Sequence, residues 1–134
     1  MKKTLTLVAM ALALSSNAFA WPDKTITLVV PFPAGGATDA LARTLTPKLQ
    51  EKLKQNVIVD NKAGATGTIG TAQVARSAPD GHTLLVSSLG PFVIAPHLIK
   101  NAAYDPLKDF DYVTVAVQAP NVLTVPAASP HKNV

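Results

Sequence analysis

One stretch decides the fold of this chain: Leu28-Val29-Val30-Pro31-Phe32-Pro33-Ala34-Gly35-Gly36-Ala37-Thr38-Asp39. A short apolar run of the β type ends at two prolines and a glycine pair, and a helical pattern then begins. We interpret it as a strand, a glycine turn and the start of a helix. The first four N–H groups of a helix have no intrahelical acceptor, and the helix dipole leaves positive potential there. The stretch therefore predicts a place where an anion or a carboxylate is favoured.

The first twenty residues predict a secretory signal peptide and not a part of the fold. Lys2 and Lys3 precede an apolar run from Leu5 to Leu14, and Ala18-Phe19-Ala20 forms a small-x-small cleavage sequence before Trp21. The alternative, a transmembrane anchor, is disfavoured because this run is about half as long as a membrane-spanning helix. The sequence has no cysteine, which excludes a disulfide and a lipid-modified cysteine. We therefore expect a mature chain that begins at Trp21 in the bacterial periplasm.

The charge of the chain gives little support for nucleic-acid binding. The formal net charge of +4 falls to +2 without Lys2 and Lys3, because ten basic residues then face eight acidic ones. The basic residues are scattered along the sequence and do not form a stripe with aromatic residues. The length after residue 20 suits one domain.

Strand and helix patterns alternate along the mature chain. Strands are predicted over residues 25–30, 56–60, 82–87, 112–117 and 121–125. A first helix is predicted from about Thr38 to Lys54, with a kink or local opening at Pro47. A second carries residues 69–75, and a short third begins at Pro91 and is interrupted at Pro96. This order predicts an α/β fold with an open, mostly parallel sheet and helices on both faces.

Three of the predicted strands end in loops of small residues, at 33–36, 64–70 and 87–91. In open α/β sheets, ligands bind outside the carboxyl ends of the strands, so these loops are expected to meet at one edge. Taken alone, each loop could be only a tight strand-to-helix turn. The repetition of the pattern favours a binding site.

The sequence lacks the usual nucleotide and catalytic signatures. The pair Gly35-Gly36 is not G-x-G-x-x-G, so Asp60 is unsupported as a ribose partner, and the G-K-[ST] phosphate loop is absent. Ser87 and Ser88 lack the G-x-S-x-G elbow, and the three histidines have no metal-type spacing. Asp39 is interpreted as an ionised first-turn or capping carboxylate. We expect no enzyme activity, cofactor or metal; the alternative is a small nucleotide- or phosphate-binding α/β enzyme.

Five runs of sequence, in this order, carry a family resemblance: VVPFPAGGATDALAR, VIVDNKAGATGTIG, APDGHTLLVSS, PHL and YDPLKDF. They resemble the N-terminal lobe of the Bug-type (TctC-like) extracytoplasmic solute receptors of tripartite tricarboxylate transporters, over essentially all of residues 21–134. The resemblance implies one lobe of a type II periplasmic binding protein, which binds a small carboxylate-bearing metabolite and delivers it to the membrane permease subunits. Residues 1–20 are then the signal peptide, 21–126 an incomplete first lobe, and 127–134 the start of a hinge crossover.

The resemblance also implies three groups of ligand-binding residues. In the family the first two groups hold a ligand carboxylate partly through ordered water, and the third helps to line the pocket. The first group is Phe32, Pro33, Ala34, Gly35, Gly36 and Asp39, the second is Gly64, Ala65, Thr66, Gly67 and Thr68, and the third is Ser87, Ser88 and Gly90. Phe32 is also expected to wall a pocket. The chain departs from the family where Ala63-Gly64 replaces a frequent Pro-Gly, and where Lys54 replaces a frequent glycine.

The family resemblance also predicts a second lobe, which supplies the specificity side of the cleft. Because one lobe offers only part of the ligand contacts and cannot close, we expect this chain alone to bind weakly or not at all. A non-functional truncated product and an interaction module, whose open sheet edge pairs with another chain, are the alternatives. The residues of this chain do not identify the carboxylate.

Overall fold

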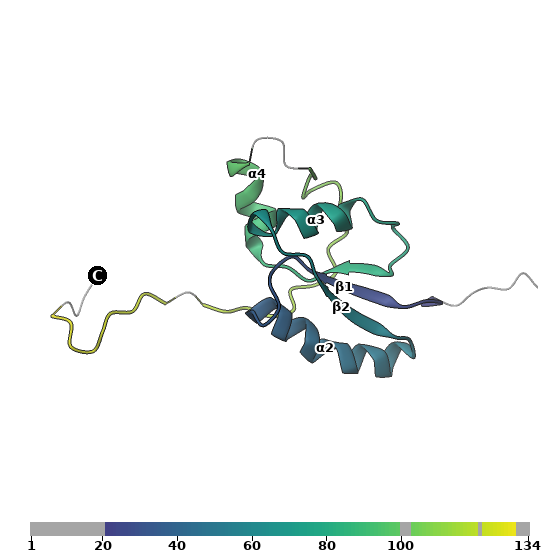
Figure 1. The fold of residues 1–134 in the computed structure, drawn as a ribbon, viewed down its shortest axis with the longest axis horizontal. Coiled ribbons are helices and arrows are strands. Elements are labelled where there is room, and N and C mark those ends of the chain that lie inside the picture. Colours follow the sequence, from purple (N-terminus) through teal and green to yellow (C-terminus); the bar gives the residue numbers. More distant parts are fainter. Residues whose placement is uncertain (1–20, 100–102, 121, 131–134) are drawn as a thin grey trace, which may run out of the picture.

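The computed structural model describes residues 21–99, 103–120 and 122–130. The predicted signal peptide, residues 1–20, lies outside the described residues, as does the end of the predicted hinge segment, residues 131–134. A parallel sheet of three strands forms the centre of the fold, in the order β2-β1-β3 (Figure 1). The strands are β1 (Ile26–Val30), β2 (Val57–Asn61) and β3 (Thr83–Leu85). Their carboxyl ends therefore lie along one edge of the sheet.

The helices cover the sheet from both sides. α2 (Ala37–Leu53) and α3 (Thr68–Ala75) lie on opposite faces of the sheet (Figure 1). A short 3-10 turn, η1 (Ala65–Gly67), leads into α3, and a π-helical turn, η2 (Gly90–Ile94), leads into α4 (Ala95–Leu98). The predicted α/β class, parallel sheet and placement of helices are confirmed.

The core forms around the central strand β1. Ile26, Leu28 and Val30 are buried with Ala42 of α2 and Val57 of β2. Val29 points to the other face and is also buried. A strand that is buried on both faces reads as a continuous apolar run without alternation, which is the pattern seen in the sequence.

Two features of α2 differ from the prediction or refine it. The helix continues through Pro47 to Leu53, so the predicted opening at Pro47 is wrong. Pro47 and Arg43 are both on the exposed side of the helix, where water can satisfy the carbonyl that proline leaves without a donor. Lys54, the residue that follows the helix, adopts the left-handed conformation with φ 53°.

The two strands predicted near the end of the chain are wrong. Residues 112–117 and the described residues 122–125 form no strand, and Asn121 lies outside the described residues. Their side chains are exposed, with Val113 at 85%. A strand requires hydrogen bonds from a neighbouring strand, and in the described part of the chain neither segment has one.

The segment before β1 is fastened to the turn before β3, at the amino ends of the strands. Trp21 Nε1 donates to the carbonyl of Asp80 at 3.0 Å, and Lys24 Nζ lies 2.7 Å from Asp80 Oδ2. The buried His82 ring lies 5.9 Å from that of Trp21, and its Nε2 lies 3.1 Å from Asp23 Oδ1. Hydrogen bonds from Lys24 and from the His82 backbone hold the pKa of Asp80 well below its usual value.

Candidate functional site

The three loops that follow the strands meet around Gly67. Phe32 follows β1, Gly67 follows β2, and Pro91 follows β3. A Cβ atom at Gly67 would lie 2.9 Å from Pro91 Cγ and 3.2 Å from Phe32 Cε1, and Gly67 has φ +92°. Both the space and the backbone conformation therefore require glycine at this position. The sequence correctly predicted that these loops meet at one edge of the sheet.

A pocket of about 220 Å³ opens where the loops meet. Each predicted loop contributes to it: Phe32 from the first, Thr66 from the second, and Ser88 and Gly90 from the third. The other lining residues come from η2, α4 and the residue after α4, and they are Pro91, Ile94, Ala95, Leu98 and Ile99. The prediction that Phe32 walls a pocket is confirmed. Among the described residues no charged side chain lines this pocket, and the polar side chains in the lining are those of Thr66 and Ser88.

The first loop forms an exposed turn beside this pocket. Pro33, Ala34, Gly35 and Gly36 are exposed, and they do not line the pocket. Gly36 is the residue before α2, and no side chain caps that end of the helix. The first-turn N–H groups have no acceptor within the helix, so they remain available to an external one.

The remaining predicted residues shape the second and third loops. Gly64 (φ +141°) and Ala65 (φ 44°) turn the chain out of β2. The Thr68 hydroxyl donates to the Ala65 carbonyl at 2.8 Å, and the Ser87 hydroxyl donates to the Ser88 carbonyl at 3.4 Å. Gly64, Ala65, Thr68 and Ser87 do not line the pocket.

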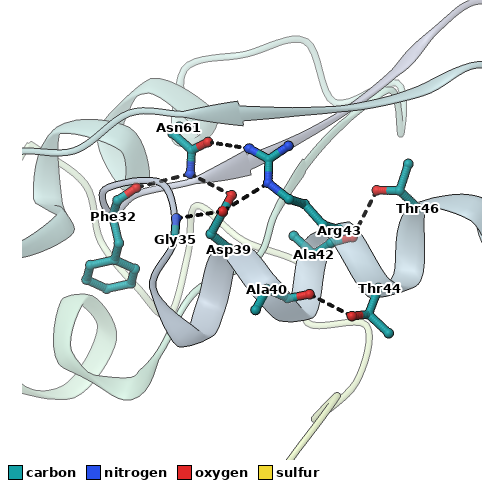
Figure 2. A network of polar contacts seen from close by, with 9 residues as sticks. All are labelled: Phe32, Gly35, Asp39, Ala40, Ala42, Arg43, Thr44, Thr46 and Asn61. Atoms are coloured by element: carbon teal, nitrogen blue, oxygen red, sulfur yellow. Dashed lines mark hydrogen bonds and ion pairs between the residues drawn. The ribbon is translucent and has the colours of Figure 1, made fainter.

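Asp39 lies at the centre of a polar network that holds the first loop (Figure 2). Its Oδ2 accepts hydrogen bonds from the backbone N–H of Gly35 at 2.8 Å and from Arg43 Nε at 2.9 Å. Its Oδ1 accepts one from Asn61 Nδ2 at 3.0 Å, and the same nitrogen donates to the Phe32 carbonyl at 3.2 Å. Arg43 Nη2 closes the network by donating to Asn61 Oδ1 at 3.1 Å. The network therefore ties the loop after β1 to the end of β2.

The network keeps the Asp39 carboxylate ionised. Its pKa is lowered from 3.8 to about 2, first by the hydrogen bond from Arg43 and then by those from Gly35 and Asn61. Asp39 lies in the first turn of α2, so its interpretation as an ionised first-turn carboxylate is confirmed. Its side chain is buried and has three donors within the chain, which makes it a support for the loop.

Sequence reasoning missed the partners of Asp39. Arg43 is four residues further along the same helix, a spacing at which opposite charges pair, so the sequence contained a signal for it. Asn61 is 22 residues away, at the end of the next strand, and only the fold brings it near.

Aromatic residues outside the pocket support η2, which forms part of the pocket lining. The Tyr104 hydroxyl donates to the Pro91 carbonyl, and burial raises the pKa of that hydroxyl. In the π-helical turn the N–H of Ala95 donates to the Gly90 carbonyl. The next residue, Pro96, has no N–H that could donate to the Pro91 carbonyl, so the Tyr104 hydroxyl supplies that donor. The ring of Phe110 lies 5.9 Å from that of Tyr104 and 5.4 Å from that of Phe92. The predicted interruption at Pro96 is thus a change from π-helical to α-helical turns.

Comparison with known proteins identifies the family. The family described as the tripartite tricarboxylate transporter family receptor matches residues 41–134. The chain belongs to this receptor family. A relative in Pseudomonas sp. strain P51, the UPF0065 protein in the tcbD-tcbE intergenic region, is 40% identical over 137 residues. The match covers 99% of this chain but 40% of that relative, so the chain spans about two fifths of the relative's length.

Solved structures have a similar fold over about two thirds of this chain. The periplasmic binding protein BugD is 48% identical, with a TM-score of 0.64 over 67% of this chain and 30% of BugD. MatC from Rhodopseudomonas palustris, solved with bound malate, is 46% identical, with a TM-score of 0.64 over 67% of this chain and 31% of MatC. A second R. palustris protein, solved with adipate, is 35% identical, with a TM-score of 0.58 over 65% of this chain and 29% of that protein. The resemblance to Bug-type receptors is confirmed.

Proposed function

We propose that residues 21–126 form the first lobe of a periplasmic receptor that binds a carboxylate-bearing metabolite. Residues 127–134 then begin the crossover to a second lobe. The observation that carries this proposal is the meeting of three strand-end loops at one pocket, where Phe32, Thr66 and Ser88 lie together. Backbone N–H groups and small hydroxyls can hold a carboxylate, and they offer no nucleophile or base activated for reaction.

The proposed site places a carboxylate between the uncapped end of α2 and the hydroxyls of Thr66 and Ser88. The first-turn N–H groups of α2 supply donors and positive potential. The proposed ligand-binding residues are the three predicted groups. Asp39 acts indirectly, because its carboxylate holds the backbone N–H of Gly35. The other residues act through backbone N–H donors, through side-chain hydroxyls or by shaping the loops. Bridging water lets such a site accept different carboxylates at little enthalpic cost. The malate and adipate in the two R. palustris structures support a carboxylate as the ligand class.

An NMR titration of the isotope-labelled chain tests the carboxylate. We expect adipate and malate at millimolar concentration to shift the amides of Thr38, Thr66 and Ser88, because one lobe supplies only part of the contacts. The uncharged adipamide should leave them unmoved. Thr66→Val and Ser88→Ala should weaken the response, whereas Ser77→Ala, whose hydroxyl bonds to the Val74 carbonyl, should not. Equal shifts with adipate and adipamide, or no shift with either acid, would contradict the proposal.

We also propose export to the periplasm and delivery of the ligand to a membrane permease. In the described part of the chain, no helix has the length and apolarity to span a membrane. Mass spectrometry of the chain recovered from the periplasm of an expressing bacterium should give an N-terminus at Trp21. The substitution Ala18→Arg, which removes the small residue of the cleavage sequence, should leave an unprocessed chain. A cytoplasmic chain that retains Met1 would contradict export.

A further inference from the structure

The lining of the pocket is mostly apolar. Thr66 and Ser88 supply its hydroxyls, whereas Pro91, Ile94 and Leu98 form an apolar wall, and the ring of Phe32 adds further apolar surface. The wall is built on η2 and α4, and Tyr104 fixes it through the Pro91 carbonyl. A second carboxylate or a hydroxyl placed against this wall would lose its hydration, and none of the described side chains of the wall could pair with it.

We infer that this wall holds the hydrocarbon body of the ligand, so the receptor selects carboxylic acids with an unsubstituted chain of about six carbons, or an aromatic ring, over short hydroxy acids. The inference rests on the proposed function, because the hydroxyls of the same pocket must hold the carboxylate. The size of the pocket supports it. A cavity of about 150 Å³ accommodates benzene, and this pocket measures about 220 Å³.

The apolar wall makes a quantitative difference between ligands. Each buried methylene tightens binding by about threefold, since part of the pocket is open to water. Extension of the acid beyond the wall should then give no further gain, because the added methylenes remain in water. A hydroxyl on the hydrocarbon chain of the ligand should reduce this gain in affinity.

An NMR titration of the chain with straight-chain acids from butanoate to octanoate, and with malate, tests the inference. We expect the dissociation constant to fall by about threefold per methylene up to about six carbons, with the Ile94 methyl signals shifting. Ile94→Asn should abolish this gain. Val93→Asn is the matched control, because Val93 is 56% exposed like Ile94 but lies outside the pocket lining.

The possible outcomes separate the inference from the proposed function. If affinity does not rise with chain length, or malate binds as tightly as hexanoate, the inference is overturned, while shifts at Thr66 and Ser88 still support a carboxylate site. Unmoved Ile94 methyl signals would mean that another segment of protein covers the wall, which also overturns it. If no acid shifts Thr66 or Ser88, both the proposed function and the inference fail.

Discussion

Asn61 donates a hydrogen bond to the buried carboxylate of Asp39 at 3.0 Å, and so joins the end of β2 to the first turn of α2. The same amide nitrogen donates to the Phe32 carbonyl, so one side chain fixes the helix start and the pocket wall together. Figure 2 shows that Arg43, one turn further along α2, donates hydrogen bonds to both Asp39 and Asn61. The position of the pocket therefore depends on residues that do not line it.

Asn61→Ala should lower the free energy of unfolding by about 1–2 kcal/mol, because a buried carboxylate oxygen and the Phe32 carbonyl lose their donor. Urea denaturation measures the change. Asn56→Ala is the control, because Asn56 is exposed just before β2 and its side chain accepts a hydrogen bond from Gln50 at 3.3 Å. This substitution should lower the free energy of unfolding by less than about 0.5 kcal/mol. Equal costs at the two positions would show that the network does not stabilise the loop.

The stability should fall in acid because of Asp39. The folded-state pKa of about 2 lies below the ordinary value of 3.8, so the unfolded chain binds more protons between these values. The contribution of Asp39 is therefore complete above about pH 4 and is lost as the pH falls toward about 2. The urea midpoint should drop less steeply over this range in Asp39→Asn than in the unchanged protein. Asp80 and Asp105, whose pKa values are also lowered, titrate in both proteins, so parallel curves would disprove the role of Asp39.

Gly67→Ala should destabilise the fold by about 3 kcal/mol, from positive φ and from the clash with Pro91 and Phe32. Gly35→Ala is the matched control, because Gly35 has φ +85° but no atom lies within 4 Å of the place that a Cβ atom would occupy. Gly35→Ala should therefore lower the free energy of unfolding by about 1 kcal/mol, the cost of the positive φ alone. Thermal or urea unfolding of both variants measures the difference, and similar costs would argue against tight convergence of the loops at Gly67.

Lys54→Gly should stabilise the chain by about 0.5–1 kcal/mol, because Lys54 ends α2 in the left-handed conformation that glycine adopts without strain. Lys52→Gly, two residues earlier inside the last turn of α2, should instead cost about 1 kcal/mol. The two variants should thus shift the urea midpoint in opposite directions, and a shift in the same direction would contradict the backbone explanation.

Local sequence patterns predicted the elements whose partners are near in the chain. The apolar run of β1, bounded by Pro31, and the repeated glycine loops were sufficient for the three strands, their shared edge and the presence of Phe32 at a pocket. The contact between Asp39 and Asn61 could not be predicted in this way, because it depends on which strands become neighbours. The same limit explains the error over residues 112–117, where an apolar pattern suits a strand but cannot supply the strand beside it.

The fastening of Trp21 to Asp80 and His82 has a practical consequence. Trp21 is the only tryptophan of the chain, and it lies at the amino ends of the strands, whereas the pocket lies beyond their carboxyl ends. Its fluorescence is therefore a label-free reporter of whether the leading segment is docked, and its emission should shift when Asp80 or His82 is replaced. Ligand entering the pocket should leave that emission unchanged, so one unmodified protein allows folding and ligand binding to be followed as separate signals.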